Sequence, residues 1–293
     1  MKKYKHPLAE VFGFKITDQT VAAKKHRDNE LCPFNNIGPR CTKDKKDAPL
    51  GVCSLYTDDS ITIICPIRFR EDWVICEHAA DFFFPKGTKY TVLKEIRLKE
   101  RTGESAGNID VVLVVHDKKG KISDFGIIEV QAVYVSGNIR NPFEYYMDDP
   151  KKRGNMDWTK KAHYPHPDYL SSSRKRLVPQ LMYKGQILRT WGKKQAVAVD
   201  RLFFETLPEL PHAPKEEAEI CWLIYELKDK AGRYALSLSE KVYTKFEPSL
   251  AKIATPVVGD EKDFIQILEG KLRSHLRFGC NAFQKSGAIR TRI

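Results

Sequence analysis

The sequence lacks any uninterrupted apolar run of the roughly 18 to 20 residues that a membrane-spanning helix needs. Its first ten residues, MKKYKHPLAE, have no apolar signal core behind their lysines. Proline and glycine are not enriched, with 16 and 17 residues among 293, and no internal repeat or low-complexity linker is present. These absences exclude a membrane protein, a collagen-like chain and a largely disordered one. We therefore expect a cytoplasmic, folded protein of one large or two modest domains.

The cysteines lack the C-x₂-C spacing of standard zinc modules. There are seven, an odd number in a chain with no export signal, which favours thiols or metal ligands over a disulfide framework. Four of them lie in the loop-rich first 70 residues, separated by 8, 11 and 11 residues: Cys32, Cys41, Cys53 and Cys65. Short turns there can direct four thiolates at one ion, although buried small hydrophobic side chains would also explain them. We expect the other three, Cys76, Cys221 and Cys280, to be buried without a ligand role.

The sequence does have an excess of positive charge, concentrated in one segment. The formal net charge is +12, and residues 151–194 hold 12 Lys and Arg against two Asp, with tyrosines and tryptophans interleaved. A concentrated positive field with aromatic neighbours suits a nucleic-acid backbone. A solvated basic face that keeps the protein soluble is the alternative. The candidate DNA-binding residues are Arg174, Lys175, Arg176, Lys184, Arg189, Lys193 and Lys194.

Hydrophobic periodicity predicts an α/β or α+β fold, with a mixed sheet flanked by helices. The expected helices cover residues 72–84, a segment that starts near Ser173, and residues 261–276. Pro179 should then kink the second helix or lie in its first turn. The expected strands cover residues 90–98, 108–115, 125–135, 195–204, 219–227 and 232–239.

The second and third of these strands form a predicted antiparallel hairpin that gathers polar side chains. Paired residues in such a hairpin have a constant index sum, and a sum near 239 to 241 places Asp110 opposite the stretch from Glu129 to Gln131. Two buried carboxylates side by side repel each other and need a cation. Mg²⁺ prefers oxygen ligands, and a metal held in this way can activate water against a phosphodiester. Glu95 could add a third carboxylate, although acids on neighbouring strands also occur as ordinary surface partners.

The strand sequences resemble a known nuclease core. IDVVLVV followed by IIEVQ is similar to the PD-(D/E)XK core, in which a strand Asp and an E-x-K pair bind catalytic Mg²⁺. Ile109 stands where that motif has Pro, and Gln131 stands where it usually has Lys. A longer series of motifs resembles the NotI family of type II restriction endonucleases, including its shorter EagI-like members, over most of the chain. The motifs are CPF at 32, Cys at 41, GVCS at 51, ICPIRF at 64, KEIRL, IDVVL, EVQAVY and SSRKRLVPQLMYKGQIL.

The NotI-like resemblance implies a Mg²⁺-dependent endonuclease that makes double-strand cuts at a GC-rich palindrome. The family's acidic cluster falls on Glu95, Asp110 and Glu129, with Gln131 as its fourth member. Asp110 and Glu129 would bind Mg²⁺, while Glu95 would bind a second ion or a water. Gln131 is neutral, so the role it can fill is to orient the attacking water, which leaves the general base open.

The resemblance also implies partners and a domain plan. A palindromic site in double-stranded DNA implies a twofold homodimer, and a cognate DNA methyltransferase is expected as a functional, not a physical, companion. The four cysteines are expected to hold structural iron or zinc, between which thiolate ligands do not choose. The plan is a loop-rich metal-binding region over residues 1–70 and a nuclease core over residues 71–293 that includes the basic segment.

Two other functions fit part of the pattern. A DNA-binding regulator with a structural metal would keep the cysteines and the basic segment but would have no use for the acids. A structure-specific repair or RNA nuclease would keep the acids but would need neither a palindrome nor a dimer. Substrate choice separates the three, because the regulator should cut nothing and the repair enzyme should follow structure instead of sequence.

Overall fold

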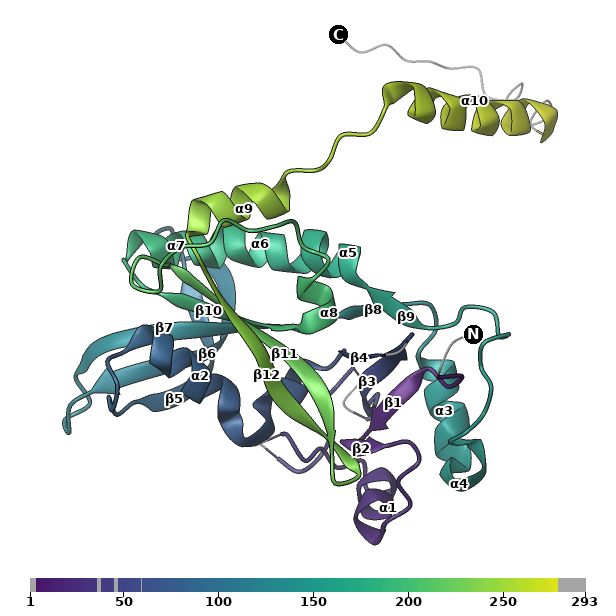
Figure 1. Ribbon diagram of the computed structural model, residues 1–293, viewed down its shortest axis with the longest axis horizontal. Helices are drawn as coiled ribbons and strands as arrows, with labels where there is room; N and C mark the ends of the chain where they lie inside the picture. The colour runs from purple at the N-terminus through teal and green to yellow at the C-terminus, as the bar shows by residue number, and fades with distance from the viewer. Residues whose placement is uncertain (1–3, 36–37, 45–46, 59, 279–293) are drawn as a thin grey trace. The chain divides into compact units, whose positions relative to one another are not determined.

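A six-stranded mixed sheet forms the centre of the protein. The computed structural model describes residues 4–35, 38–44, 47–58 and 60–278. The strand order is β12-β11-β10-β7-β6-β5, with β10 parallel to both of its neighbours and the remaining pairs antiparallel (Figure 1). The strands are β5 (Thr91–Lys99), β6 (Ser105–His116), β7 (Ile122–Gln131), β10 (Gln195–Asp200), β11 (Ile220–Lys230) and β12 (Arg233–Thr244). The predicted mixed sheet is confirmed.

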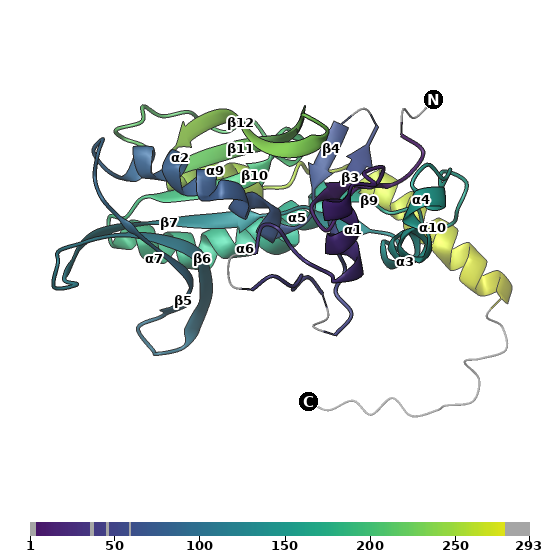
Figure 2. The same cartoon turned by 90° about the horizontal axis from the view of Figure 1, so that it is seen from below.

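Both faces of the sheet are buried, as expected for its parallel centre. In β10, every residue of QAVAVD is buried, and alternate side chains join different clusters. Val197 and Val199 belong to the cluster that the helical segment 169–190 and α9 (Phe246–Ala254) cover. Ala196 and Ala198 face α2 (Val74–Phe83) on the other side. Figure 2 shows α2 and the helical segment 169–190 on opposite sides of β7.

Residues 169–190 form one continuous helix that lies across the sheet. It consists of α5 (Tyr169–Ser172), a π-helical stretch (Ser173–Leu177), α6 (Val178–Gln180), a second π-helical stretch (Leu181–Gly185) and α7 (Gln186–Thr190). The helix starts four residues before the predicted Ser173, because the Asp168 side chain accepts a hydrogen bond from the Ser171 N–H and caps it. Pro179 lies inside the helix and not in its first turn. The π-helical stretch before it changes the backbone hydrogen-bonding pattern, which accommodates a residue without an N–H.

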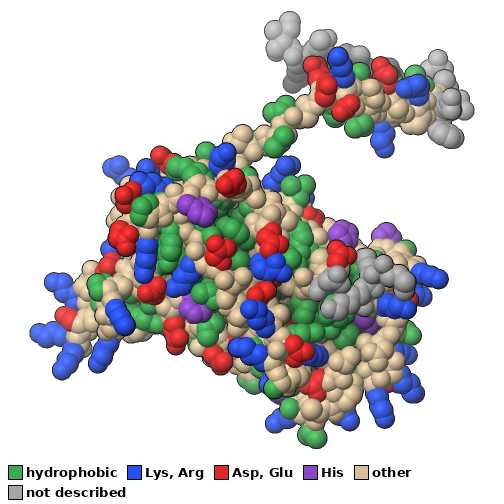
Figure 3. Space-filling model, viewed as in Figure 1, with side chains coloured by type: hydrophobic (Ala, Val, Ile, Leu, Met, Phe, Trp, Pro, Cys, Tyr) green, Lys and Arg blue, Asp and Glu red, His purple; other side chains and the backbone are tan. Residues whose placement is uncertain are grey.

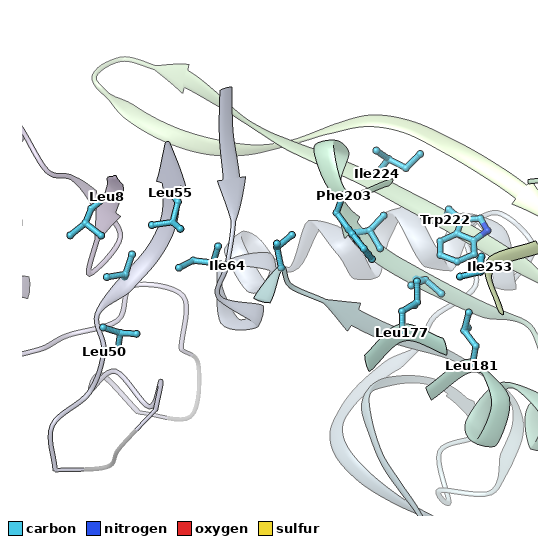
Figure 4. Close-up of a cluster of buried hydrophobic side chains, with 14 of the residues drawn as sticks. Leu8, Leu50, Leu55, Ile64, Leu177, Leu181, Phe203, Trp222, Ile224 and Ile253 are labelled. Atoms are coloured by element: carbon cyan, nitrogen blue, oxygen red, sulfur yellow. The ribbon is translucent and has the colours of Figure 1, made fainter. Parts of the chain in front are cut away.

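The first 70 residues are less loop-rich than predicted, because they form a four-stranded antiparallel sheet of order β2-β1-β3-β4. Its strands are β1 (Leu8–Val11), β2 (Phe14–Lys15), β3 (Val52–Thr57) and β4 (Ser60–Ile63). Leu8 and Leu55 share one buried cluster with Phe203 and Trp222, as Figure 4 shows. The chain divides into the compact units Met1–Ala254 and Thr255–Ile293.

The remaining elements connect these sheets or follow them. They are α1 (Val21–Asp28), the 3₁₀ segment η1 (Pro66–Trp73), β8 (Tyr134–Ser136), α3 (Arg140–Asp148), α4 (Pro150–Arg153), β9 (His166–Asp168), α8 (Arg201–Phe204) and α10 (Glu261–Phe278). The strand predicted over residues 195–204 ends at Asp200, whose side chain accepts from the Phe203 N–H and caps α8. Among the described residues, no helix is long and apolar enough to cross a membrane.

Candidate active site

Three acidic side chains lie in register across β5, β6 and β7, and we call them the acid row. Val111 pairs with Ile128, an index sum of 239, so Asp110 lies opposite Glu129 as predicted. On the other side of β6, Lys94 and Ile96 of β5 pair with Val111 and Ile109. Glu95 therefore lies opposite Asp110. The structure therefore brings Glu95, Asp110 and Glu129 together from three adjacent strands.

Burial and mutual repulsion dominate the electrostatics of the acid row. Glu129 is 3% exposed, and burial, reinforced by the neighbouring Asp110, raises the pKa of Glu129 to about 8 against the opposing effect of Lys184. Burial also raises the pKa of Asp110, although the Val130 N–H, 2.8 Å from its Oδ2, favours the charged form. Such a pair is costly without a cation and suits a site that binds one.

Lys184 supplies a cation to this site from the helix above it. Its Nζ donates to Glu129 Oε2 at 2.5 Å and to the Asn108 carbonyl oxygen at 2.8 Å. Lys184 is 4% exposed, so the prediction that it lies on a DNA-binding surface is wrong: its side chain is buried. A buried lysine needs a partner of opposite charge, and Glu129 is that partner.

Two further polar contacts hold the edges of the site. Arg70, which sequence reasoning missed, donates through Nη2 to Glu95 Oε1 at 2.8 Å. Gln131 is buried, and its Nε2 donates to the Ala132 carbonyl oxygen at 2.7 Å. That bond fixes the orientation of the amide and leaves Gln131 Oε1 available as an acceptor.

A groove joins the acid row to the predicted DNA-binding helix. Asp110 and Gln131 line it from the sheet, and Lys175 and Arg176 line it from the helix. Arg176 also lies over the Tyr134 ring, 5.1 Å from its centroid. Arg174, Lys175 and Arg176 are exposed and form no ion pair within the part of the chain that the structure describes. A groove with the Asp110 carboxylate on one wall and the free cations of Lys175 and Arg176 on the other suits a phosphate backbone.

The other predicted DNA-binding residues do not line this groove and have partners of their own. Arg189 pairs with Glu219 and Glu247, Lys193 pairs with Asp124, and Lys194 lies over the Phe82 ring. On the face shown in Figure 3, basic and acidic side chains interleave over much of the surface. The charge excess of residues 151–194 therefore leaves few free cations at the groove.

The four amino-terminal cysteines converge on one small cavity, which Cys32, Cys41, Cys53 and Cys65 all line. Burial, with smaller contributions from the nearby Cys65 and Cys41, raises the pKa of Cys32 to about 11. Within residues 4–35, 38–44, 47–58 and 60–278, however, no three His, Cys, Asp or Glu side chains are close enough to hold a metal ion. Cys76 and Cys221 are buried, as predicted, and Cys280 lies outside the described residues.

Comparison with known proteins identifies the family. The model of the restriction endonuclease NotI family matches residues 10–238. This range includes the acid row, the four cysteines and the helix of residues 169–190, which we call the groove helix. The chain belongs to the NotI restriction endonuclease family. A comparison with curated proteins finds no match. As a member of this family, the protein is a DNA nuclease that acts on double-stranded DNA.

Restriction endonucleases generally use Mg²⁺, and the residues of this site fit such an ion. Glu129 Oε1 is buried and has no hydrogen-bond partner among the described residues. An orphaned carboxylate oxygen beside a second carboxylate is the donor chemistry that hard cations prefer. Asp110 and Glu129 are therefore the residues that would hold the metal.

The sequence contained a signal for Lys184 that its charge obscured. Lys184 follows Leu177 by seven residues and Leu181 by three, and it precedes Leu188 by four, so it lies on the buried stripe of the helix. A lysine on an apolar stripe indicates a buried partner. Arg70 had no comparable signal, because it meets Glu95 through tertiary packing alone.

Proposed function

We propose that this NotI-family protein is a type II restriction endonuclease with a PD-(D/E)XK-like core that makes Mg²⁺-dependent double-strand cuts at a GC-rich palindrome. The groove is the main support for this proposal, because Asp110 and Gln131 line one side of it and Lys175 and Arg176 line the other. Cations on the helix would hold the DNA backbone while Asp110, the member of the acid row that lines the groove, faces the phosphate to be cut. The choice of a GC-rich palindrome rests on the family resemblance.

In the proposed mechanism the chain provides ligands and orientation. Asp110 and Glu129 would hold Mg²⁺, and Glu95 would bind a second ion or a water. Gln131, with its amide fixed on the Ala132 carbonyl, accepts a hydrogen bond from the attacking water through Oε1. When bound, Mg²⁺ polarises the phosphate and lowers the pKa of a bound water.

We also propose that the four cysteines form a structural iron or zinc site. The shared cavity and the mutual influence of the thiols support it. Soft thiolates suit either metal, and metal binding would displace the protons that burial otherwise retains on the thiols. Such a site would stabilise the loops that join β1, β3 and β4.

A palindromic site calls for a twofold homodimer, and we propose α10 as its contact. In this helix Ile265, Leu268, Leu272 and Leu276 are exposed and recur at helical spacing. The first turn is acidic, with Glu261 and Asp263, whereas the second half carries Lys271 and Arg273. Two antiparallel copies would therefore place opposite charges together while they bury the apolar stripe.

Digestion of a sequenced, unmethylated, GC-rich plasmid tests the nuclease proposal. Purified protein with Mg²⁺ should give discrete fragments whose mapped ends share one palindrome, and EDTA should abolish them. Glu129→Gln, which keeps the size of the side chain but removes its charge, should lower cleavage at least about 100-fold, because it removes a metal ligand. Binding of the same DNA in Ca²⁺ should change less than threefold.

Glu216→Gln is the matched control, since Glu216 is exposed and lies outside the acid row. It should cut at the wild-type rate. Wild-type activity in Glu129→Gln would overturn the site assignment. Tight, salt-sensitive binding without any cutting would instead indicate a DNA-binding regulator, and cleavage that follows DNA structure would indicate a repair nuclease.

A further inference from the structure

We propose that Lys184 is a positioning residue of the metal site, holding one oxygen of Glu129 so that the other stays free for Mg²⁺. This inference rests on the proposed nuclease function and deepens it. Lys184 Nζ donates to Glu129 Oε2 at 2.5 Å, whereas Glu129 Oε1 is buried without a hydrogen-bond partner among the described residues. A metal at Oε1 therefore need not displace the lysine.

The charges of the site give Lys184 a second effect. Asp110 and Glu129 lie opposite each other on β6 and β7, and their repulsion would drive the side chains apart or expel one from the site. Gln131 is neutral and cannot offset this charge. The ammonium group of Lys184 can, and its second hydrogen bond, to Asn108, ties it to the strand that carries Asp110.

Close packing on two sides determines where the lysine can reach. A Cβ on Gly185 would lie only 2.4 Å from the Phe246 ring, so α9 packs directly against the turn that carries Lys184. On the other side, a Cβ on Gly107 would lie 3.8 Å from Lys184 Cδ, in ordinary contact. The turn that carries Lys184 is therefore held against α9 at Gly185, while the lysine stem lies along β6 with its ammonium group at the acid row.

A structural ion pair would share these contacts, so the decisive measurement is metal affinity. We expect Lys184→Met to weaken Mn²⁺ binding to the DNA-free protein about 10- to 100-fold in titration calorimetry, the range typical for lost partners of metal ligands. The Mg²⁺ concentration for half-maximal cleavage should rise by a similar factor. DNA binding in Ca²⁺ should stay within threefold, because Lys184 is buried away from the surface.

Arg189→Met is the matched control, because Arg189 lies on the same helix and is also ion-paired, but with Glu219 and Glu247. Its Mn²⁺ affinity should stay at the wild-type value. If Lys184→Met does not fold by circular dichroism, Lys184→Gln replaces it. The same weakening is expected there, because a neutral amide binds a carboxylate less strongly than an ammonium does.

Two unfavourable results have different meanings. Wild-type Mn²⁺ affinity in the folded Lys184 variant, with Glu129→Gln still abolishing binding, would overturn the role of Lys184 and leave the nuclease site intact. Equal Mn²⁺ affinity in wild type and Glu129→Gln would overturn the proposed metal site itself, and the role of Lys184 with it.

Discussion

Buried charged side chains in this protein have partners that come from distant parts of the chain. Arg68, fully buried, bonds to Glu10, to Glu71 and to the Tyr234 carbonyl oxygen. Its side chain therefore joins β1 and η1 to β12. Removing one partner of such a buried pair leaves an uncompensated charge, which typically destabilises a protein by roughly 3 to 5 kcal/mol.

His6 gives the protein a pH-dependent stability. Burial lowers the pKa of His6 from 6.5 to about 4, and its Nδ1 accepts from the Leu8 N–H, which requires the neutral ring. As pH falls from 6.5 to 4, the unfolded state gains a proton that the folded state does not. The free energy of unfolding should then fall by about 3 kcal/mol from this residue.

Urea unfolding of wild type and His6→Gln between pH 7 and pH 4 measures this effect as a difference. The two proteins are compared because Asp200 titrates in the same pH range. Burial raises the pKa of Asp200 to about 7, so its protonation stabilises the folded state as pH falls and opposes the effect of His6. The comparison cancels the contribution of Asp200, which both proteins share. Parallel pH profiles for the two proteins would contradict the assignment to His6.

At the scale of elements, the groove helix combines a buried stripe with an exposed basic turn. Replacing Arg174, Lys175 and Arg176 together by Gln should weaken DNA binding and reduce the slope of log affinity against log salt by about 3, since each phosphate contact contributes about 0.9. Fluorescence anisotropy at several salt concentrations measures it. The control, Lys24 and Lys25 both changed to Gln on the exposed side of α1, should leave the slope unchanged. An unaltered slope in the triple variant would indicate that DNA binds to another surface of the protein.

The next prediction concerns the proposed metal site of Cys32, Cys41, Cys53 and Cys65. Cys53→Ser should lower the metal content of purified protein and its melting temperature, because the proposed site would lose one of four ligands. Cys76→Ser, at a buried cysteine of α2, should lower the melting temperature without changing the metal content. Elemental analysis decides the matter, and an unchanged metal-to-protein ratio in Cys53→Ser would reject the site.

Local patterns predicted the elements that depend on neighbouring residues. The β6–β7 hairpin has the expected index sum, because a short turn and an alternating pattern determine its register. The groove helix was placed on its apolar stripe, but its start was missed, since an aspartate instead of a serine caps it. α3 and α9 were not predicted, and short helices of this kind depend on tertiary packing more than on propensity.

The site divides in the same way. Asp110 and Glu129 could be aligned from sequence, because a short antiparallel hairpin brings them together, whereas Glu95 was named through the family resemblance and its register comes from the structure. The contacts of Lys184 and Arg70 could not, because each depends on how a helical segment packs against the sheet. Sequence reasoning thus named the three acids that the structure brings together and missed the contacts of the two cations beside them.

For the whole molecule, α10 provides a test of assembly. Leu268→Glu places a charge in the exposed stripe and should shift the protein from dimer to monomer in sedimentation equilibrium, with loss of double-strand cutting in one event. Gln266→Glu, an exposed residue beside this stripe, should remain a dimer. A monomeric wild type or a dimeric Leu268→Glu would contradict the proposal that α10 forms the dimer contact. If the protein is a monomer and α10 is protected from hydrogen exchange, α10 packs against its own chain instead.

The position of Lys184 in the chain also bears on the order of folding. The contact between Asp110 and the Val130 N–H spans 20 residues, whereas the contact between Lys184 and Glu129 spans 55. Closing the longer loop costs about 1 kcal/mol more in chain entropy. The hairpin is therefore expected to form first, with its carboxylates still hydrated, and the groove helix to dock later. Asp110 and Glu129 would lose their hydration water only when Lys184 docks beside them. The last step in burying this site is therefore the pairing of Glu129 with Lys184.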